Sequence, residues 1–171
     1  GMIDLKIFPN EISDYSFFDA LNNDKFKLLF LLGSDNLDFK KKGEFVVYVG
    51  SHGDKGAEIA DIILPSAAYT EQNGLFINLE GRVQECKKAS YPIGESSEDW
   101  KIFNLILKKL GKNENLSNFD LLRKEVLNLI PNYTNLNELP SFKESEVINT
   151  SADFISEEVN IKALDYVFTN A

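Results

Sequence analysis

Three short apolar runs dominate the middle of the chain. They lie at residues 27–32, 45–49 and 61–64, and their apolar residues follow one another without polar alternation. Uninterrupted runs of this length are typical of strands covered on both faces, as in a parallel sheet between helices. Each run ends in a loop signal, at residues 33–36, 50–53 and 65–66. The pattern therefore predicts an α/β fold with a mostly parallel sheet and flanking helices.

Shorter patterns surround these runs. Residues 3–7 alternate with period two and predict a half-buried strand, and Ser13 and Asp14 offer N-caps for a short helix that ends before Asn22. Glycine turns at residues 73–74 and 80–81 bound β-rich runs at residues 75–78 and 82–84. Together these two runs predict a small β meander.

Two amphipathic helices are predicted in the second half. Ser96 precedes Asp99 at a spacing similar to a capping box, and the helix that follows ends at Gly111. Its apolar face is Trp100, Phe103, Leu107 and Leu110. The second helix runs from about residue 118 to residue 130 and is stopped by Pro131; its stripe is Phe119, Leu122, Val126 and Leu129.

The chain beyond Pro131 is poor in apolar residues. Residues 132–160 hold six acidic side chains and a single Lys143, so this stretch cannot bury enough surface to fold unaided. We expect an extended acidic arm, with a last amphipathic piece at residues 161–168 that docks through Leu164, Val167 and Phe168. The sequence thus divides into an α/β segment with a β meander (1–111) and a helix with an extended C-terminal arm (112–171).

Charge and cysteine content exclude several classes of protein. The 18 Lys+Arg and 27 Asp+Glu give a net charge of -9, which would repel a nucleic acid backbone. The longest apolar run is far shorter than the roughly 20 residues of a membrane helix, so we expect no direct membrane insertion and an intracellular protein. Cys86 is the single cysteine; it cannot supply a disulfide, a four-cysteine zinc site or an iron–sulfur cluster, and is interpreted as a small apolar filler. Gly1 before Met2 leaves open where the natural chain starts.

The loop after the second run carries the residues that most resemble a catalytic group. His52 is the one histidine, but Ser51 is its direct neighbour, and two adjacent side chains point apart if the chain is extended. Asp54 and Asp61 could orient the imidazole. We favour a loop histidine bonded to backbone over a general base.

Gly50, Gly53 and Gly56 invite a phosphate-binding interpretation, because glycine loops before helices expose backbone N–H groups to anions. The spacing G-x-x-G-x-x-G matches neither a dinucleotide fingerprint nor a P-loop. A strand-to-helix turn that needs positive φ angles is the simpler interpretation.

The other polar candidates have simple structural interpretations. Asp35 and Asn36 follow a central strand and could bond a ligand, although capping their own turn is favoured. Charged side chains also cluster around the predicted meander: Glu71, Glu80, Arg82 and Glu85. They could include a buried Glu–Arg pair, but we favour a hairpin face exposed to solvent. We therefore assign no catalytic, cofactor-binding or metal-binding residue.

Four ordered motifs carry a resemblance to a known family. They are LLFLLGSDN (28–36), FVVYVGSHGDKGAEIADIILPSAAYTE (45–71), GLFINLEGRVQ (74–84) and EDWKIFNLILKKLG (98–111). This series resembles the C-terminal part of the large iron–sulfur subunit of respiratory complex I, called the G subunit in bacteria, a relative of molybdopterin oxidoreductases. The motifs lie between about residues 26 and 111, roughly half the chain.

The resemblance implies a role for the parent subunit. Such a subunit carries iron–sulfur clusters in its N-terminal region and passes electrons from NADH toward quinone, whereas this chain lacks the cluster cysteines. The chain is then expected to be a non-catalytic structural segment without a cofactor of its own, in contact with other parts and subunits of the peripheral arm. It would lie on the cytoplasmic side of the inner membrane, or on the matrix side in a mitochondrion. Two alternatives stay open: a molybdopterin- or nucleotide-binding oxidoreductase domain, and a free-standing interaction module.

Overall fold

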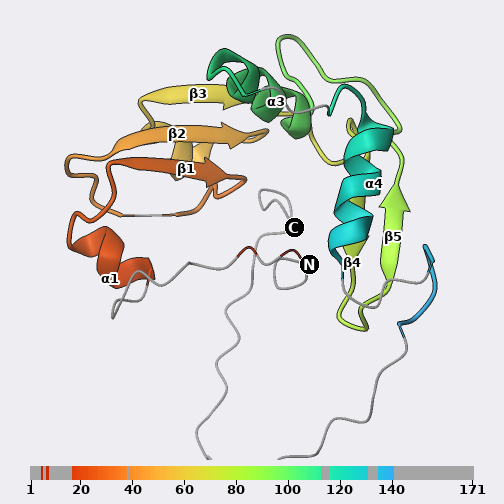
Figure 1. Cartoon of the computed structure of the whole chain (residues 1–171). Coiled ribbons are helices and arrows are strands. Elements are labelled where there is room, and N and C mark those ends of the chain that lie inside the picture. Colours follow the sequence, from red (N-terminus) through yellow and green to blue (C-terminus); the bar gives the residue numbers. More distant parts are fainter. Residues whose placement is uncertain are drawn as a thin grey trace, which may run out of the picture.

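A three-stranded parallel sheet lies at the centre of the fold. The computed structural model describes residues 5, 7, 17–37, 39–112, 116–130 and 135–140. The sheet contains β1 (Leu28–Leu32), β2 (Phe45–Gly50) and β3 (Ile62–Pro65) in the order β1-β2-β3 (Figure 1). Its register pairs Leu29 with Val46 and Val47 with Ile62. The carboxyl ends of all three strands therefore meet at one edge, where the loops that carry the polar candidates begin.

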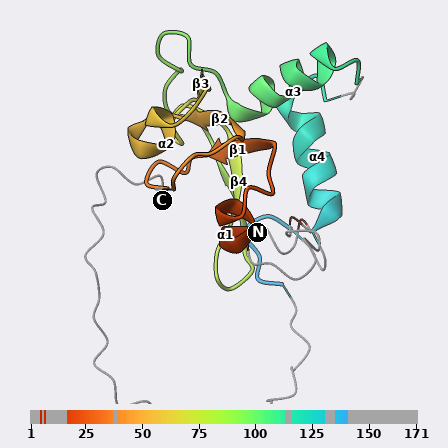
Figure 2. The same cartoon turned by 90° about the vertical axis from the view of Figure 1, so that its left-hand side faces the viewer.

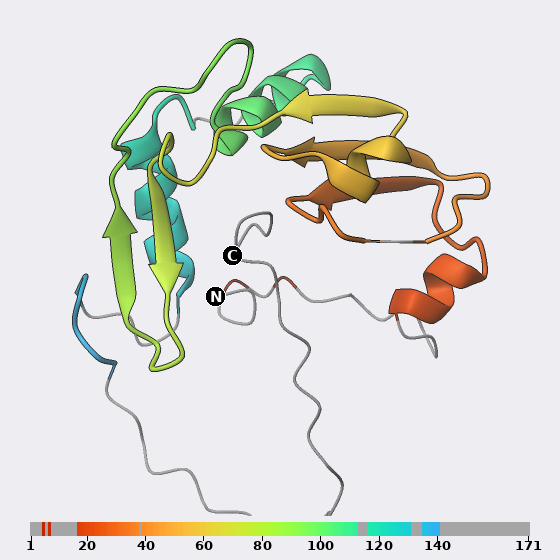
Figure 3. The same cartoon turned by 180° about the vertical axis from the view of Figure 1, so that it is seen from behind.

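Helices lie on both faces of this sheet. On one face, α1 (Phe17–Asn22) and α2 (Asp54–Glu58) help enclose a core centred on Leu31, Val46 and Tyr48 (Figure 3). On the other face, Ile102 of α3 (Asp99–Lys109) packs with Val47 and Val49. Figure 2 shows α2 and α3 on opposite sides of the strands.

A second, smaller unit is built from an antiparallel hairpin and a helix. The hairpin pairs β4 (Gly74–Ile77) with β5 (Val83–Cys86), and α4 (Phe119–Leu129) lies beside it (Figures 1 and 3). Arg123 Nη1 of α4 lies 3.5 Å from Glu85 Oε2 of β5. The two-stranded hairpin is the small β element that the glycine turns predict, and α3 follows it along the chain.

The prediction that all three strands are covered on both faces is right only for β2. In β1, buried Leu29 and Leu31 alternate with exposed Leu28, Phe30 and Leu32. β3 is also largely exposed. The physical reason is position: β1 and β3 are the edges of a three-stranded sheet, whereas α3 packs against Val47 and Val49 of the central strand.

Two further local expectations differ from the structure. Glu98 is the N-cap of α3, while the Ser96 hydroxyl donates to the Ile93 carbonyl, so Ser96 forms no capping box. Leu5 and Ile7 are described but belong to no strand; the rest of the predicted strand at residues 3–7 lies outside the described residues. In contrast, the Asn118 side chain caps α4 by accepting from the Leu121 N–H.

The C-terminal arm falls largely outside the described residues, as does the amphipathic piece at residues 161–168. Within the described part, the Asn137 N–H donates to the Val83 carbonyl at 2.8 Å, so residues 135–140 run beside β5. None of the helices in the described residues is long and apolar enough to cross a membrane.

Candidate functional site

A strand-like segment before α3 fixes that helix to the carboxyl edge of the sheet. The Ser97 N–H donates to the Pro65 carbonyl at 3.2 Å, and the Ala67 N–H donates to the Ser97 carbonyl at 2.9 Å. These bonds continue the end of β3 with a parallel bridge between Ser66 and Ser97. The next two residues, Glu98 and Asp99, are therefore held where the sheet, α3 and the hairpin come together.

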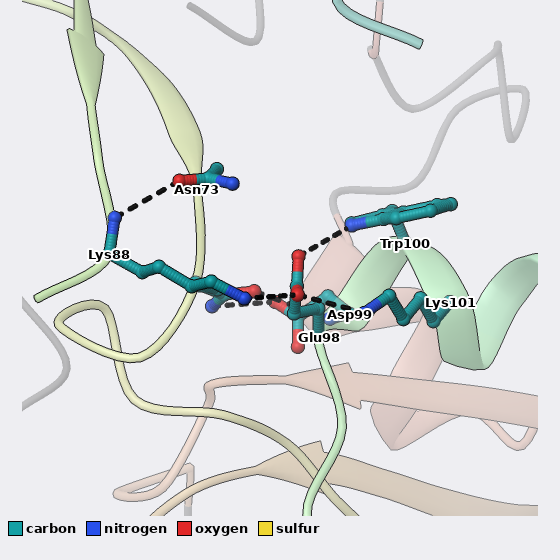
Figure 4. A network of polar contacts seen from close by, with 7 residues as sticks. Asn73, Lys88, Glu98, Asp99, Trp100 and Lys101 are labelled. Atoms are coloured by element: carbon teal, nitrogen blue, oxygen red, sulfur yellow. Dashed lines mark hydrogen bonds and ion pairs between the residues drawn. The ribbon is translucent and has the colours of Figure 1, made fainter. Parts of the chain in front are cut away.

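Glu98 is a buried carboxylate between two lysines and an indole. Its side chain is 4% exposed. Lys101 Nζ lies 2.9 Å and Lys88 Nζ 3.4 Å from Glu98 Oε1, while Trp100 Nε1 donates to Oε2 at 2.8 Å (Figure 4). The Lys88 N–H also donates to Asn73 Oδ1, which fixes the chain around Lys88 beside the start of β4.

These neighbours keep Glu98 ionised. Burial alone would raise the pKa of Glu98, but hydrogen bonds from Lys101 and Trp100 and the positive charges of both lysines outweigh it and hold the pKa below its ordinary value. A carboxylate with a lowered pKa is a poor proton shuttle near neutral pH. The group therefore acts as a fixed anion that joins α3 to the loop after β5.

Asp99 makes the second half of the same cluster. Its carboxylate accepts from the Ser66 hydroxyl and lies 3.5 Å from Gln72 Nε2. The Asp99 backbone N–H in turn donates to Gln72 Oε1. Gln72 Nε2 also donates to the Ala67 carbonyl. These bonds connect the end of β3, the turn before β4 and the first turn of α3, so the whole cluster is a structural junction.

A second buried polar group lies on the other side of the sheet. The Tyr48 hydroxyl donates to the carboxylate of Asp35, which is 3% exposed, and accepts from the Gly53 N–H at 2.9 Å. Burial, reinforced by the bond to Asp35, raises the pKa of Tyr48 to about 12. The sequence predicts that Asp35 caps its own turn; in the structure its carboxylate binds a tyrosine from the neighbouring strand.

The glycine loop serves this tyrosine. Gly53 has φ 98°, in agreement with a strand-to-helix turn that needs positive φ angles, whereas Gly50 and Gly56 do not have positive φ angles. A Cβ at Gly50 would overlap the Tyr48 hydroxyl, and one at Gly56 would lie 2.6 Å from the Ser34 carbonyl oxygen. The two glycines are needed for space. The Gly53 N–H, which a phosphate-binding loop would offer to an anion, is already bonded to Tyr48.

His52 and Ser51 lie closer together than expected. Ser51 Oγ is 2.9 Å from His52 Nδ1, because β2 ends at Gly50 and the next two residues form a bend in which neighbouring side chains can meet. Both residues are exposed. In a catalytic triad the serine bonds Nε2 and the acid bonds Nδ1, so this contact has the wrong geometry.

The two acids that could orient His52 occupy other positions. Asp61 accepts from the Val46 N–H at 2.7 Å and lies 2.6 Å from Lys41 Nζ, at the amino end of β2 and not at its carboxyl end. The bonds from Lys41 and Val46 also hold the pKa of Asp61 below its ordinary value. Asp54 is the exposed first residue of α2.

The remaining candidates are dispersed. Asn36 is exposed, Cys86 is a partly buried free thiol, and Glu71 accepts from the Ala68 N–H. Arg82 lies 3.9 Å from exposed Glu80, and Glu85 pairs with Arg123 of α4 instead. A buried Glu–Arg pair is therefore absent among the described hairpin residues. Arg82 Nε is nonetheless buried without a hydrogen-bond partner in the described part of the chain.

A cavity of about 390 Å³ opens at the carboxyl ends of the three strands, where open α/β sheets commonly bind ligands. Its lining includes Gly33, Gly50, Ser66 and Asp99, and Asp99 is the one charged residue that the described part of the chain contributes to it. Asp99 and Ser66 are already bonded to each other. An anionic nucleotide or pterin phosphate would thus meet a carboxylate and no cation among the described residues, which do not fit such a cofactor.

Metal-ligating side chains are dispersed in space. Within residues 17–37, 39–112, 116–130 and 135–140, no group of three or more His, Cys, Asp or Glu side chains is placed to hold a metal ion. The expectation that this chain carries no cofactor of its own stays a prediction.

The parallel sheet with helices on both faces defines the class as an α/β domain. Within that class, the family model for molybdopterin oxidoreductase matches residues 4–109, and the chain belongs to this family. The match begins before the sheet and ends at the last residue of α3.

Several curated relatives are named as subunits of NADH-quinone or NADH-ubiquinone oxidoreductase. The chain is 40% identical over 146 residues to the NADH-quinone oxidoreductase G subunit of Rickettsia bellii, covering 84% of this chain and 21% of the relative. It is 36% identical over 159 residues to the G subunit of Rickettsia typhi, covering 92% and 23%. It is 35% identical over 178 residues to the NADH-ubiquinone oxidoreductase 75 kDa subunit of Reclinomonas americana, covering 100% and 25%. The chain thus spans no more than 25% of the length of these three relatives.

The sequence analysis missed the central residue of each buried cluster. Glu98 and Tyr48 are ordinary members of a helix start and an apolar strand, and neither stands out by spacing. The available signal was chemical: a tyrosine in an otherwise aliphatic strand and a carboxylate beside a tryptophan both need polar partners when buried.

Proposed function

We propose that this chain is a non-catalytic structural segment of the large iron–sulfur subunit, the G subunit, of an NADH:quinone oxidoreductase. The parentage is supported by the similarity to G-subunit and 75 kDa subunit proteins over 84% to 100% of the chain. The clusters that carry electrons would reside in the rest of that subunit, because redox centres of this kind need several thiolates and this chain has only Cys86.

The single observation that carries the structural role is the state of the Glu98 carboxylate. It is buried, ionised and bonded by Lys101, Lys88 and Trp100. A group tied in this way holds α3 against the loop after β5 and is not free for proton transfer. The Tyr48 hydroxyl and the Asp35 carboxylate are tied to each other in the same manner. We infer that this chain has no catalytic, cofactor-binding or metal-binding residue.

The partners follow from the parentage. The chain would pack against other parts of the G subunit and other subunits in the peripheral arm, without binding nucleic acid. It would lie beside the inner membrane on its cytoplasmic side, or on the matrix side in a mitochondrion. A location beside the inner membrane is compatible with the described residues, which contain no helix able to cross a membrane.

The test is co-purification from cells of the source organism. NADH:quinone oxidoreductase isolated by native electrophoresis should contain peptides of this chain in a fixed ratio to the other subunits. The isolated chain should neither oxidise NADH nor contain stoichiometric iron. Absence of its peptides from the active complex would contradict the proposal, and a coloured, iron-containing isolated chain would contradict the non-catalytic role.

A thermal-shift measurement addresses the cofactor-binding alternative. A ligand present at about 100 times its dissociation constant stabilises a protein by roughly 2.7 kcal/mol. We expect no shift with guanine nucleotides or pterin phosphates, because Asp99 is the one charged group that the described residues place in the lining of the cavity at the sheet edge. A saturable shift that Asp99→Asn enhances would favour the alternative.

A further inference from the structure

One face of the parallel sheet is only half covered. Five apolar side chains on this face are exposed by 39% to 56%: Leu28, Phe30 and Leu32 of β1, Phe45 of β2 and Ile62 of β3. We call these five residues the open sheet face. The register places them together, because Leu28 pairs with Phe45, and Phe30 and Ile62 both pair with Val47.

The cover on this side comes from α3 and stops short. Phe103 and Ile102 of α3 pack with Val47 and Val49, and the rings of Phe30 and Phe103 lie 6.2 Å apart. This covers the centre of the sheet toward its carboxyl edge. Figure 1 shows α3 beside the β3 end of the sheet, and β1 farthest from it. Leu28 and Phe45, at the amino ends of their strands, remain about half exposed.

The opposite face of β1 is closed. Leu29 and Leu31 are 7% and 2% exposed, and they pack with Leu21 of α1 and residues of α2. Parallel sheets occur almost only where both faces are covered, usually by helices. A contiguous exposed apolar surface on an otherwise packed sheet is typical of an interaction site. The asymmetry within single strands indicates that a covering layer is missing above β1.

Chain length and charge indicate what that layer is. The relatives extend far beyond the region that matches this chain, which spans only 21% of the Rickettsia bellii protein. Ample polypeptide of the parent subunit thus exists outside the 171 residues to form a covering layer. A second copy is a poorer occupant, because each copy has a net charge of -9 and would repel the other.

We propose that the open sheet face is the surface through which this chain packs against the remainder of the large iron–sulfur subunit, by way of an apolar helix face laid over β1. The inference rests on the proposed function and adds to it the residues that form the contact. Its residues should become buried when the complex assembles, while the exposed hairpin turn at Leu79 should not.

Site-directed cross-linking tests the contact in the assembled complex. The photoreactive residue p-benzoylphenylalanine replaces Phe30 in the full chain, in cells of the source organism, and replaces Leu79 in the control. After illumination, mass spectrometry of the purified complex should find position 30 joined to peptides of the large iron–sulfur subunit outside the region that matches residues 4–109. A cross-link to α3 of the same chain is expected in any case, because the rings of Phe30 and Phe103 lie 6.2 Å apart. The proposal would be overturned if position 30 joined a second copy, another subunit or a part of this chain outside α3 and did not join the large iron–sulfur subunit. The absence of any cross-link beyond α3 in a complex that contains the chain would overturn it as well.

A matched pair of charge variants gives a second readout. Leu28→Glu places a carboxylate on the open sheet face at a position 52% exposed, and Leu79→Glu places one on the fully exposed hairpin turn. We expect the amount of the Leu28→Glu variant found in the complex to fall at least tenfold, and the amount of the Leu79→Glu variant to stay unchanged. The two isolated variants should have equal melting temperatures. Normal incorporation of Leu28→Glu would overturn this inference alone. Failure of the unmodified chain to join the complex would overturn the proposed function and, with it, this inference.

Discussion

The hydroxyl of Tyr48 donates a hydrogen bond to the buried carboxylate of Asp35, joining the middle of β2 to the loop that follows β1. The same hydroxyl accepts from the Gly53 N–H. One phenol thus links two of the three loops at the carboxyl edge of the sheet. In an α/β domain these loops commonly hold a ligand, and here they are closed on each other by a side chain of the core.

Tyr48→Phe should destabilise the domain. The substitution removes the hydrogen bond that the hydroxyl donates to the buried Asp35 carboxylate and the one it accepts from the Gly53 N–H, and the loss of a buried polar partner costs roughly 1–3 kcal/mol. Urea unfolding should show this loss, with an unchanged m-value. Tyr91→Phe is the control, because Tyr91 is 78% exposed and its replacement should have little effect. Equal stabilities of the two variants would mean that the buried bond contributes nothing net.

Alkaline pH should weaken the fold through the same residue. The pKa of Tyr48 is raised to about 12 in the folded chain from an ordinary value of 10.0. Between these values the folded state binds more protons than the unfolded state, so stability is intact below pH 10 and falls as the pH rises toward 12. A shift of this size corresponds to roughly 2–3 kcal/mol. Unfolding free energies measured from about pH 9 to about pH 12 should decline, and Tyr48→Phe should remove that part of the slope.

Gly56→Ala should be more damaging than Gly43→Ala. A Cβ at Gly56 would lie 2.6 Å from the Ser34 carbonyl oxygen, which is backbone and cannot turn aside, whereas one at Gly43 would meet only the Asp24 side chain at 3.8 Å. We expect a loss of about 2 kcal/mol or more at Gly56, in the range of overpacked sites, and less than about 1 kcal/mol at Gly43. Thermal unfolding of the two variants checks this, and similar melting temperatures would show that the helix α2 can move away from Ser34.

Local pattern was sufficient to predict the elements whose cause is local. The uninterrupted apolar run at residues 45–49 became the buried central strand, and the Asn118 side chain starts α4 where the stripe of Phe119 and Leu122 begins. The parallel order of the strands also follows from runs without alternation. The burial of β2 and the start of α4 each depend on residues within one strand or one helix turn.

Contacts between residues that are distant in the sequence could not be predicted from local pattern. Asp35 meets Tyr48 only because the pairing of β1 with β2 places the loop after β1 beside β2, and Ser66 meets Asp99 across 33 positions of sequence. The exposure of Phe30 depends on how far α3 reaches over the sheet, which the apolar run containing Phe30 does not encode. Chemistry that arises from register and layer geometry is therefore visible only in the folded chain.

Glu98→Gln tests the buried anion that joins α3 to the hairpin side of the molecule. Hydrogen bonds to a charged group contribute roughly 1.5–3 kcal/mol, and the glutamine keeps the shape but loses the charge that Lys101 and Lys88 face. We expect a loss of about 1–3 kcal/mol near neutral pH. Glu95→Gln, at an exposed position, is the control and should stay near the stability of the unmodified protein.

The pH dependence separates the charge of Glu98 from mere packing. Because its folded pKa lies below the ordinary value of 4.5, the stabilisation is complete above that value and is lost as the pH falls through the lowered folded pKa. The unmodified protein should therefore lose stability in acid below about pH 4.5 more steeply than Glu98→Gln, and the two unfolding free energies should converge. A constant difference between them from about pH 7 down to about pH 3 would assign the effect of the substitution to packing and would refute the role of Glu98 as a buried, ionised carboxylate.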